Sequence, residues 1–161
     1  GGATGHFTIA ACERYPEIRG IVFDLPQAAP AARENIAQSP AAGRMRVVEG
    51  DFFRDELPEA DLYALGRILH DWPEPRIKLL LDRIYDRLPP GGGLLIAEWL
   101  LNEDGVGPVS ANMQSLNMLV CAEGRERTAS DYERLLRASG FAEVRARRTG
   151  KTLDAVLAIR G

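Results

Sequence analysis

The sequence has 161 residues, of which 45% are hydrophobic and 27% are charged, and its formal net charge is −3. This length is enough to bury a hydrophobic core without disulfides or metals, so a single domain is the default expectation. The mildly acidic composition argues against a basic nucleic-acid-binding surface, and no apolar run reaches the roughly 18 residues that a membrane span needs.

Short apolar runs alternate with helical patterns, which is typical of βα units and a mainly parallel sheet. The chain opens on the glycine-rich stretch GGATG, and residues 6–14 then predict a helix. GIVFDLP predicts a buried strand that ends on Asp24, residues 27–38 predict a helix, and MRVVEGDFF predicts a strand that closes on Asp51. ADLYALGRIL predicts the next strand, which ends at His70.

The second half of the chain continues this alternation. Apolar residues at i, i+3, i+4, i+7 and i+11 predict one buried helix face over residues 74–88. GLLIAEWLL then predicts a strand with Glu98 near its carboxyl end, and residues 109–122 predict a helix. TASD is a capping-box pattern, with Asp in place of the usual Glu, that opens a helix to Ser139. FAEVRAR and TLDAVLAI predict a terminal hairpin.

Two further features lie outside this alternation. Cys12 and Cys121 have no CxxC partner and no metal-ligand spacing, so we expect free buried thiols in an intracellular, cytoplasmic protein. Arg145, Arg147 and Arg148 form a local basic cluster, which we expect to be the solvated face of an edge strand. No group of residues has the spacing of a metal site.

Polar side chains stand where four successive predicted strands end. They are Asp24, Asp51, the pair His70-Asp71, and Glu98. Ligands of open α/β sheets bind outside the carboxyl ends of the strands, where the strand order reverses. Each of these residues alone could be a helix cap, but together they predict a ligand crevice.

The first strands carry the pattern of a nucleoside-binding site. The glycines of GGATG, which are Gly1, Gly2 and Gly5, allow a tight turn and close approach of a ligand to the backbone. The helix that follows offers free N–H groups to a negatively charged group. Asp24 follows at the spacing of a carboxylate that binds ribose hydroxyls, and Asp51 with Phe52 could bracket an adenine. NAD and S-adenosylmethionine both fit, but GGxxG in place of GxGxxG and the terminal hairpin favour S-adenosylmethionine.

His70 has two readings that the sequence leaves open. It could lie in a strand-to-helix turn that Asp71 caps, or it could be a general base at the lip of the crevice. An imidazole with a pKa near 6.5 can accept the proton of a phenol, whose own pKa is about 10. A carboxylate on Nδ1–H would fix the tautomer, and Glu98 is the first choice because neighbouring strands lie about 4.8 Å apart.

The motifs GGATG, FDLP, GDFF, RILHDW, PPGGGLLIAEWLL and EGRERT closely resemble class I S-adenosylmethionine-dependent O-methyltransferases. The resemblance spans essentially the whole chain and is strongest to the hydroxyindole, or acetylserotonin, branch. It implies a Rossmann-like α/β fold, with a mostly parallel sheet and a C-terminal antiparallel hairpin. The family's N-terminal helical domain, which dimerises, and its first strand are absent here, so residues 1–161 would be the catalytic domain of a protein that is a homodimer when full length.

The resemblance also implies roles for individual residues. His70 would be the catalytic base with Glu98 and Glu126 as acidic partners, although Glu123 competes with Glu126 for that assignment. Cofactor contacts would come from Gly1, Gly2, Gly5, Asp24, Gly50, Asp51, Phe52, Arg67 and Trp72. Acceptor contacts would come from Asp71, Asn112, Met113, Leu116 and Asn117.

The expected reaction transfers a methyl group from S-adenosylmethionine to a hydroxyl of a small aromatic acceptor, without a metal and without nucleic-acid or membrane partners. One alternative is a methyltransferase-like binding module that keeps the fold but lacks turnover. A nicotinamide-dependent oxidoreductase is the second alternative, which the glycine spacing and the hairpin disfavour.

Overall fold

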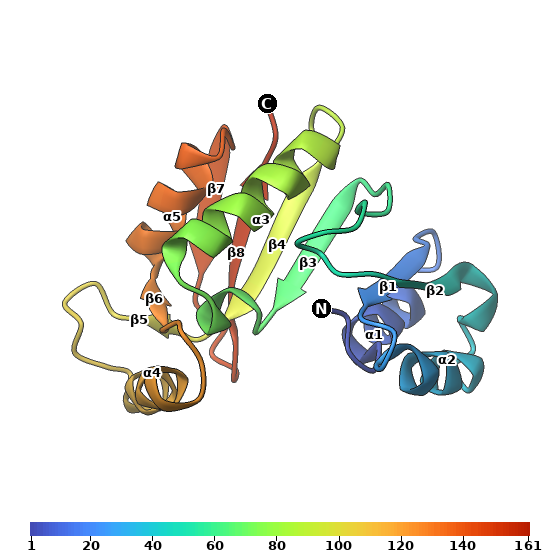
Figure 1. The fold of residues 1–161 in the computed structure, drawn as a ribbon, viewed down its shortest axis with the longest axis horizontal. Coiled ribbons are helices and arrows are strands. Elements are labelled where there is room, and N and C mark those ends of the chain that lie inside the picture. Colours follow the sequence, from blue (N-terminus) through green and yellow to red (C-terminus); the bar gives the residue numbers. More distant parts are fainter. The chain divides into compact units, whose positions relative to one another are not determined.

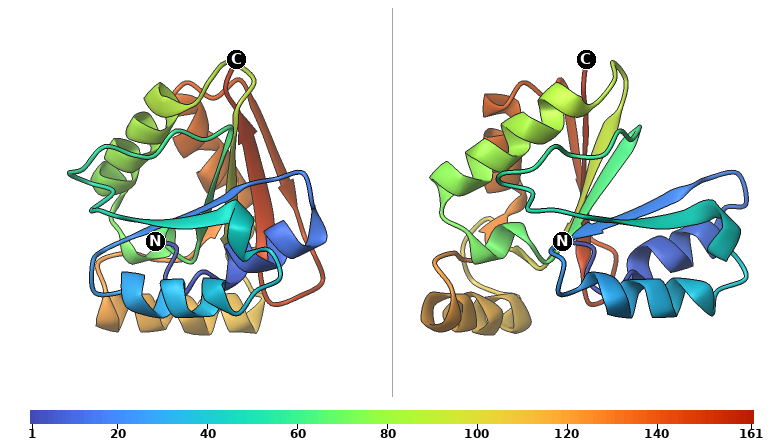
Figure 2. Two further views of the ribbon diagram at one scale, coloured as in Figure 1. Left: turned by 90° about the vertical axis from the view of Figure 1, so that its right-hand side faces the viewer. Right: turned by 45° about the vertical axis from the view of Figure 1, so that its right-hand side comes forward.

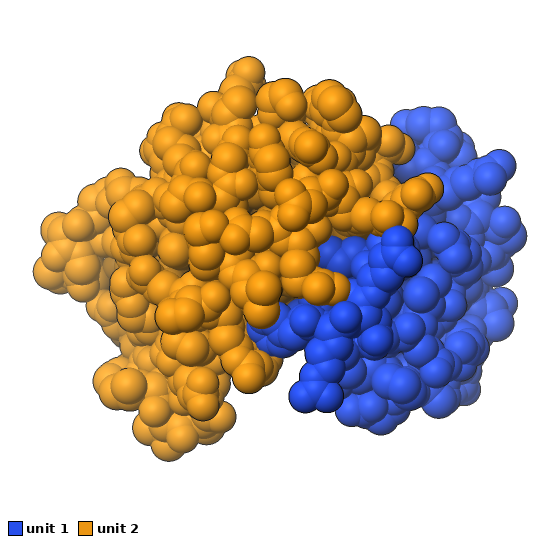
Figure 3. Space-filling view, turned by 45° about the horizontal axis from the view of Figure 1, so that its top comes forward, with its two compact units in different colours: residues 1–58 blue, residues 59–161 orange.

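The computed structural model describes all of residues 1–161. The chain divides into two compact units, residues 1–58 and residues 59–161, which Figure 3 shows in different colours. No helix in either unit combines the length and the apolar character that a bilayer crossing requires.

The first unit is a parallel two-stranded sheet with two helices on one side (Figure 2). Its elements are α1 (His6–Arg14), β1 (Gly20–Asp24), α2 (Ala29–Ala37), the 3-10 turn η1 (Ala42–Arg44) and β2 (Met45–Glu49). The strands pair from Gly20 with Met45 to Asp24 with Glu49. Val22 of β1 and Ala32 and Ile36 of α2 form the core. This pairing places the ends of β1 and β2 at one edge, as the sequence predicts for Asp24 and Asp51.

The second unit contains a four-stranded sheet in the order β3-β4-β8-β7. Its larger elements are β3 (Leu62–Gly66), the 3-10 turn η2 (Leu69–Asp71), α3 (Glu74–Arg87), β4 (Gly93–Glu98), α5 (Ala129–Ala138), β7 (Glu143–Arg147) and β8 (Asp154–Ile159). β3 and β4 are parallel, whereas β8 runs antiparallel to both β4 and β7, which is the predicted hairpin. The helices α3 and α5 cover one face of this sheet (Figure 1).

A small second sheet connects the remaining elements of this unit. β5 (Leu100–Leu101) pairs in parallel with β6 (Arg127–Thr128), and α4 (Val109–Cys121) lies between them in the chain. The predicted capping box opens α5: Thr128 Oγ1 accepts the N–H of Asp131, and the Asp131 carboxylate accepts the N–H of Thr128. Helix α5 therefore begins directly after the strand that carries Arg127.

Three local expectations were wrong. The strand predicted to end at His70 is β3 and ends at Gly66, because Arg67 takes a left-handed backbone conformation, with φ of 56°, and the chain then enters the turn η2. The strand after PPGGG is interrupted at Trp99, so β5 belongs to a different sheet from β4. Cys12 is buried as expected, but Cys121 at the end of α4 is exposed.

Candidate active site

His70 lies in the turn η2, not at the end of a strand. Its side chain is only 3% exposed, and the two acidic partners considered for it, Glu98 and Glu126, are equally buried. Glu98 ends β4, which pairs with β3, and Glu126 directly precedes β6. The structure thus brings together three of the predicted site residues, from positions up to 56 apart in the sequence.

Glu126, and not Glu98, forms the hydrogen bond to the imidazole. His70 Nδ1 lies 2.6 Å from Glu126 Oε1, whereas the nearest Glu98 oxygen lies 3.5 Å from Nδ1. The choice of Glu98 as the group that orients His70 was therefore wrong: its Oε1 accepts the backbone N–H groups of Ile68 and Leu69, at 2.9 and 3.0 Å. A carboxylate only accepts hydrogen bonds, so in the neutral imidazole Nδ1 carries the proton and Nε2 keeps its lone pair.

Burial and charge act in opposite directions on this cluster. Burial by itself lowers the pKa of His70, but the hydrogen bond to Glu126 and the charges of Glu98, Glu126 and Asp71 outweigh it and raise that pKa above its ordinary value. Burial raises the pKa of Glu98 to about 7, although the His70 charge opposes this shift. The cluster therefore favours the protonated form of the His70 imidazole.

The same three side chains could in principle bind a cation, since one ligand atom of each lies within 4.8 Å of the others. Two ligands of one Zn²⁺ ion, each at about 2.1 Å, would stand roughly 3.4 Å apart in tetrahedral geometry. The 2.6 Å between Nδ1 and Oε1 is shorter than that and matches a charge-assisted hydrogen bond. The arrangement fits proton transfer better than metal binding.

The segment before α5 packs directly on the backbone of the His70 turn. The N–H of Glu123 donates to the carbonyl of Asp71, and a Cβ at Gly124 would lie 2.6 Å from the Trp72 nitrogen. Arg127 is 1% exposed and donates to the carbonyls of Leu69, Arg125 and Trp72. Sequence reasoning assigned no role to Arg127; the only signal was its place in EGRERT beside Glu126.

In the first unit, a hydrogen bond joins the glycine turn to Asp24. Gly5 has φ of 81°, and the N–H of Gly2 donates to the Phe23 carbonyl at the end of β1. Asp24 accepts the N–H groups of Ala3 and Leu25, at 2.6 and 2.7 Å. A Cβ at Gly2 would meet Val22 at 2.6 Å, so this position requires glycine.

Gly50, Asp51 and Phe52 follow β2 at the same edge of that unit. A Cβ at Gly50 would lie 2.6 Å from the Phe23 ring, which explains a glycine there. Asp51 accepts the N–H of Phe53, and the Phe52 and Phe53 rings meet edge to face with centroids 4.7 Å apart. Asp51 and Phe52 both remain half-buried.

The remaining predicted residues lie at several places in the second unit. The guanidinium of Arg67 lies 5.0 Å from the centre of the Trp99 ring, and that of Arg76 lies 4.9 Å from the Trp72 ring. Asp71 Oδ1 lies 3.5 Å from His70 Nε2. The other four predicted acceptor-contacting residues are on α4, where they range from half-buried to exposed: Asn112, Met113, Leu116 and Asn117.

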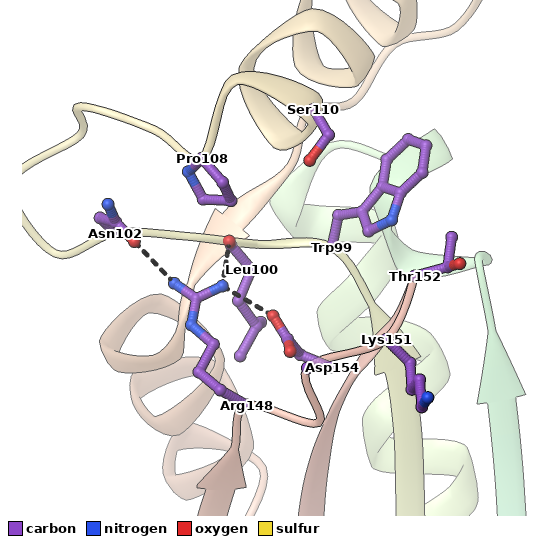
Figure 4. A pocket seen from close by; sticks show the side chains of 10 residues that line it. Trp99, Leu100, Asn102, Pro108, Ser110, Arg148, Lys151, Thr152 and Asp154 are labelled. Atoms are coloured by element: carbon purple, nitrogen blue, oxygen red, sulfur yellow. Dashed lines mark hydrogen bonds and ion pairs between the residues drawn. The ribbon is translucent and has the colours of Figure 1, made fainter.

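A pocket of about 340 Å³ opens between the β7–β8 turn and the start of α4 (Figure 4). The Trp99 side chain forms one wall, and Arg148 lies at the opposite side. The Arg148 guanidinium is held by the Leu100 carbonyl, Asn102 and Asp154. Arg145 and Arg147 are exposed on the edge strand β7, as expected for the basic cluster, but Arg148 joins the hairpin to β5. The pocket contains no predicted site residue.

The fold and the buried His–Glu pair define an O-methyltransferase type of α/β domain. Residues 1–142 match the model of the O-methyltransferase domain family, and the chain belongs to that family.

Acetylserotonin O-methyltransferase of Bos taurus is 49% identical over 158 residues, which cover 98% of this chain and 46% of that protein. The crystal structure of human N-acetylserotonin methyltransferase in complex with SAM is similar with a TM-score of 0.95 and 43% identity, over 100% of this chain and 46% of that one. An O-methyltransferase family 2 protein from Planctomyces limnophilus, in complex with apigenin, has a TM-score of 0.94 and 32% identity, over 99% of this chain and 49% of that one.

These similarities confirm the predicted fold class, a Rossmann-like methyltransferase sheet with a C-terminal antiparallel hairpin. The chain spans just under half the length of the three relatives named above.

Proposed function

We propose that residues 1–161 are the S-adenosylmethionine-binding catalytic domain of an O-methyltransferase that methylates a hydroxyl of a small aromatic acceptor, with His70 as general base. The observation that supports this most directly is the buried hydrogen bond from His70 Nδ1 to Glu126, which leaves Nε2 able to accept a proton. The similarity to a protein crystallised with SAM supports S-adenosylmethionine as the methyl donor, and the similarity to one crystallised with apigenin supports an aromatic acceptor.

The first unit has groups that fit the parts of S-adenosylmethionine. Asp24 uses one acceptor position on each oxygen for backbone N–H groups, so lone pairs remain for ribose hydroxyls. No side chain caps the start of α1, so its first-turn N–H groups can face the carboxylate of the amino-acid part. Gly1, Gly2 and Gly5 would pass beside that part, and Gly50, Asp51 and Phe52 beside adenine. Arg67 and Trp72, which belong to the second unit, remain predicted cofactor contacts.

S-adenosylmethionine supplies, when bound, a methyl group on a positively charged sulfur. Nε2 of His70 takes the proton of the acceptor hydroxyl as the oxygen–methyl bond forms and the sulfur–methyl bond breaks, which leaves a methyl ether, S-adenosylhomocysteine and an imidazolium. Glu126 stabilises that imidazolium through the Nδ1 hydrogen bond. General base catalysis of this kind contributes roughly 10²–10⁴-fold.

The acceptor would be held by Asp71 and by the face of α4 that carries Asn112, Met113, Leu116 and Asn117. Met113 and Leu116 are 62% and 59% exposed, so apolar surface on α4 is available to an aromatic ring. In the full-length protein we expect an N-terminal helical domain to close this side and to form a homodimer. The free thiols of Cys12 and Cys121 favour a reducing compartment such as the cytoplasm.

The test compares His70→Gln with the unchanged protein, both expressed from the complete reading frame. Transfer of a labelled methyl group is measured over a panel of phenols and hydroxyindoles, and calorimetry measures binding of S-adenosylmethionine, S-adenosylhomocysteine and NAD. We expect S-adenosylmethionine and S-adenosylhomocysteine to bind both proteins equally, NAD to bind neither, and kcat to fall by about 10²–10⁴-fold in H70Q.

Wild-type turnover in H70Q would exclude His70 as the base. Cofactor binding without turnover on any acceptor would instead favour the catalytically silent binding module. Binding of NAD in place of S-adenosylmethionine would overturn the proposal as a whole.

A further inference from the structure

The turn that carries His70, residues 68–72, is held by contacts to its backbone from two other segments. Glu98 accepts the N–H groups of Ile68 and Leu69, which the turn leaves without a strand partner. Gly124 packs so closely on the turn that a Cβ would overlap the His70 carbonyl oxygen. The turn itself contains only 3-10 hydrogen bonds, from Asp71 to Ile68 and from Trp72 to Leu69. Its position therefore depends on groups outside it.

Arg127 is the group that contacts both ends of this turn. Its Nη1 lies 3.2 Å from the Leu69 carbonyl oxygen, and its Nη2 lies 3.1 Å from the Trp72 carbonyl oxygen. Nη1 also donates to the carbonyl of Arg125, at 2.9 Å, which ties the turn to the segment that carries Glu126. The two carbonyl groups of the turn flank His70 in the sequence, so the guanidinium fixes the backbone on both sides of the imidazole.

We propose that Arg127 is a positioning residue for the general base: it locks residues 69–72 against the segment 125–127, and so holds His70 Nδ1 on Glu126. This inference rests on the proposed function of His70. Arg127 does not contact the imidazole, and it acts through the backbone of the turn. The neighbouring residue Glu126 contacts the His70 ring. Arg127 therefore fixes the backbone of the turn, while Glu126 fixes the histidine side chain.

The geometry requires a guanidinium and not merely a positive charge. Arginine presents five N–H donors in a planar fork, and here two of its nitrogens reach carbonyls that are three residues apart. A lysine would keep the charge but offers donors from one tetrahedral nitrogen only. Arg127→Lys therefore removes the fork while it leaves the electrostatic environment of Glu98 and Glu126 nearly unchanged.

The experiment measures the pKa of His70 by NMR of ¹³Cε1-labelled histidine in wild type, Arg127→Lys and Arg125→Lys, each expressed from the complete reading frame. Loss of the signal in His70→Gln assigns it. Arg125 is the matched control, because its side chain is half-exposed and pairs with Glu74 and Asp131 at the surface. Methyl transfer is measured in parallel.

In R127K we expect the His70 pKa to fall, because the turn moves and the hydrogen bond that raises it weakens while the ring stays buried. The kcat should fall by about 10- to 100-fold, the loss expected for a displacement of up to about 1 Å, with the KM for the methyl donor within about twofold. R125K should match wild type in both readouts.

A lower melting temperature in R127K with an unchanged His70 pKa and unchanged kcat would show a purely structural role and overturn the proposal. Should R127K fail to fold, Arg127→Gln, which keeps a planar donor, is measured in its place, and failure of both variants to fold also overturns it. The NMR readout does not depend on turnover. A shifted His70 pKa in a protein without methyltransferase activity would therefore support the positioning role and reject the proposed function separately.

Discussion

The two buried glutamates beside His70 should differ sharply in their effect on catalysis. Glu126 accepts the Nδ1 proton at 2.6 Å, whereas Glu98 lies 3.5 Å from that nitrogen and spends one oxygen on two backbone N–H groups. Glu126→Gln removes the charge that stabilises the imidazolium and keeps the shape. Glu98→Gln keeps an amide oxygen that the same two N–H groups can still reach.

Hydrogen bonds to charged groups contribute about 1.5–3 kcal/mol, and each 1.36 kcal/mol corresponds to tenfold in rate. We therefore expect E126Q to lower kcat by roughly 10- to 150-fold. If the new amide turns its NH₂ group toward Nδ1, the proton moves to Nε2 and the loss becomes larger, because the base is then in the wrong tautomer. E98Q should cost less than about tenfold, since Glu98, with a pKa of about 7, is already close to half-protonated at neutral pH.

The assay is single-turnover methyl transfer at saturating S-adenosylmethionine, about pH 7, with cofactor affinity measured for each variant. Glu123→Gln is the control, because the Glu123 side chain is exposed and only its backbone meets the turn. A loss in E98Q equal to or larger than that in E126Q would refute the assignment of Glu126 as the group that orients His70. Such a result would instead support Glu98, which the sequence favours because neighbouring strands lie close together.

Two further predictions concern stability. The raised pKa of Glu98, about 7 against an ordinary 4.5, means that the folded state binds a proton more tightly than the unfolded state, so this contribution is complete below about pH 4.5 and is lost as the pH rises to about 7. In urea titrations from about pH 5 to pH 8, the free energy of unfolding of wild type should fall by up to about 3 kcal/mol relative to that of E98Q. The exposed control Glu34→Gln should follow wild type. Parallel curves of unfolding free energy against pH for E98Q and wild type would contradict this prediction. Thr128→Ala removes the capping oxygen of α5, which should cost about 1 kcal/mol of stability and lower the melting temperature by roughly 2–4 °C. Thr152→Ala, at an exposed position, is the control. Equal melting temperatures for the two variants would show that the cap contributes nothing.

Local signals in the sequence predicted most of the elements correctly. The helix over 74–88, the TASD capping box and the terminal hairpin depend on residues that are close in the chain, so periodicity and capping chemistry were sufficient to find them.

The errors arose where distant segments decide the local conformation. Ile68 and Leu69 continue an apolar run, but their N–H groups bind Glu98, about 30 residues away, and the chain turns instead of extending the strand. The choice between Glu98 and Glu126 depends on how β6 packs beside the His70 turn, which no spacing in the sequence encodes. The positive φ of Arg67 likewise has no local signature, since arginine rarely adopts it.

One side of helix α4 contacts the backbone of Glu126, and another side is exposed. Ser115 Oγ accepts the N–H of Glu126 and so helps to hold the carboxylate on which the base depends. Met113 and Leu116, two residues before it and one after it, project outward instead, at 62% and 59% exposure. Under the proposed function, acceptor preference can thus change on the outward side of α4 without altering proton transfer. A library built for new acceptors should vary residues 113 and 116 and keep serine at 115.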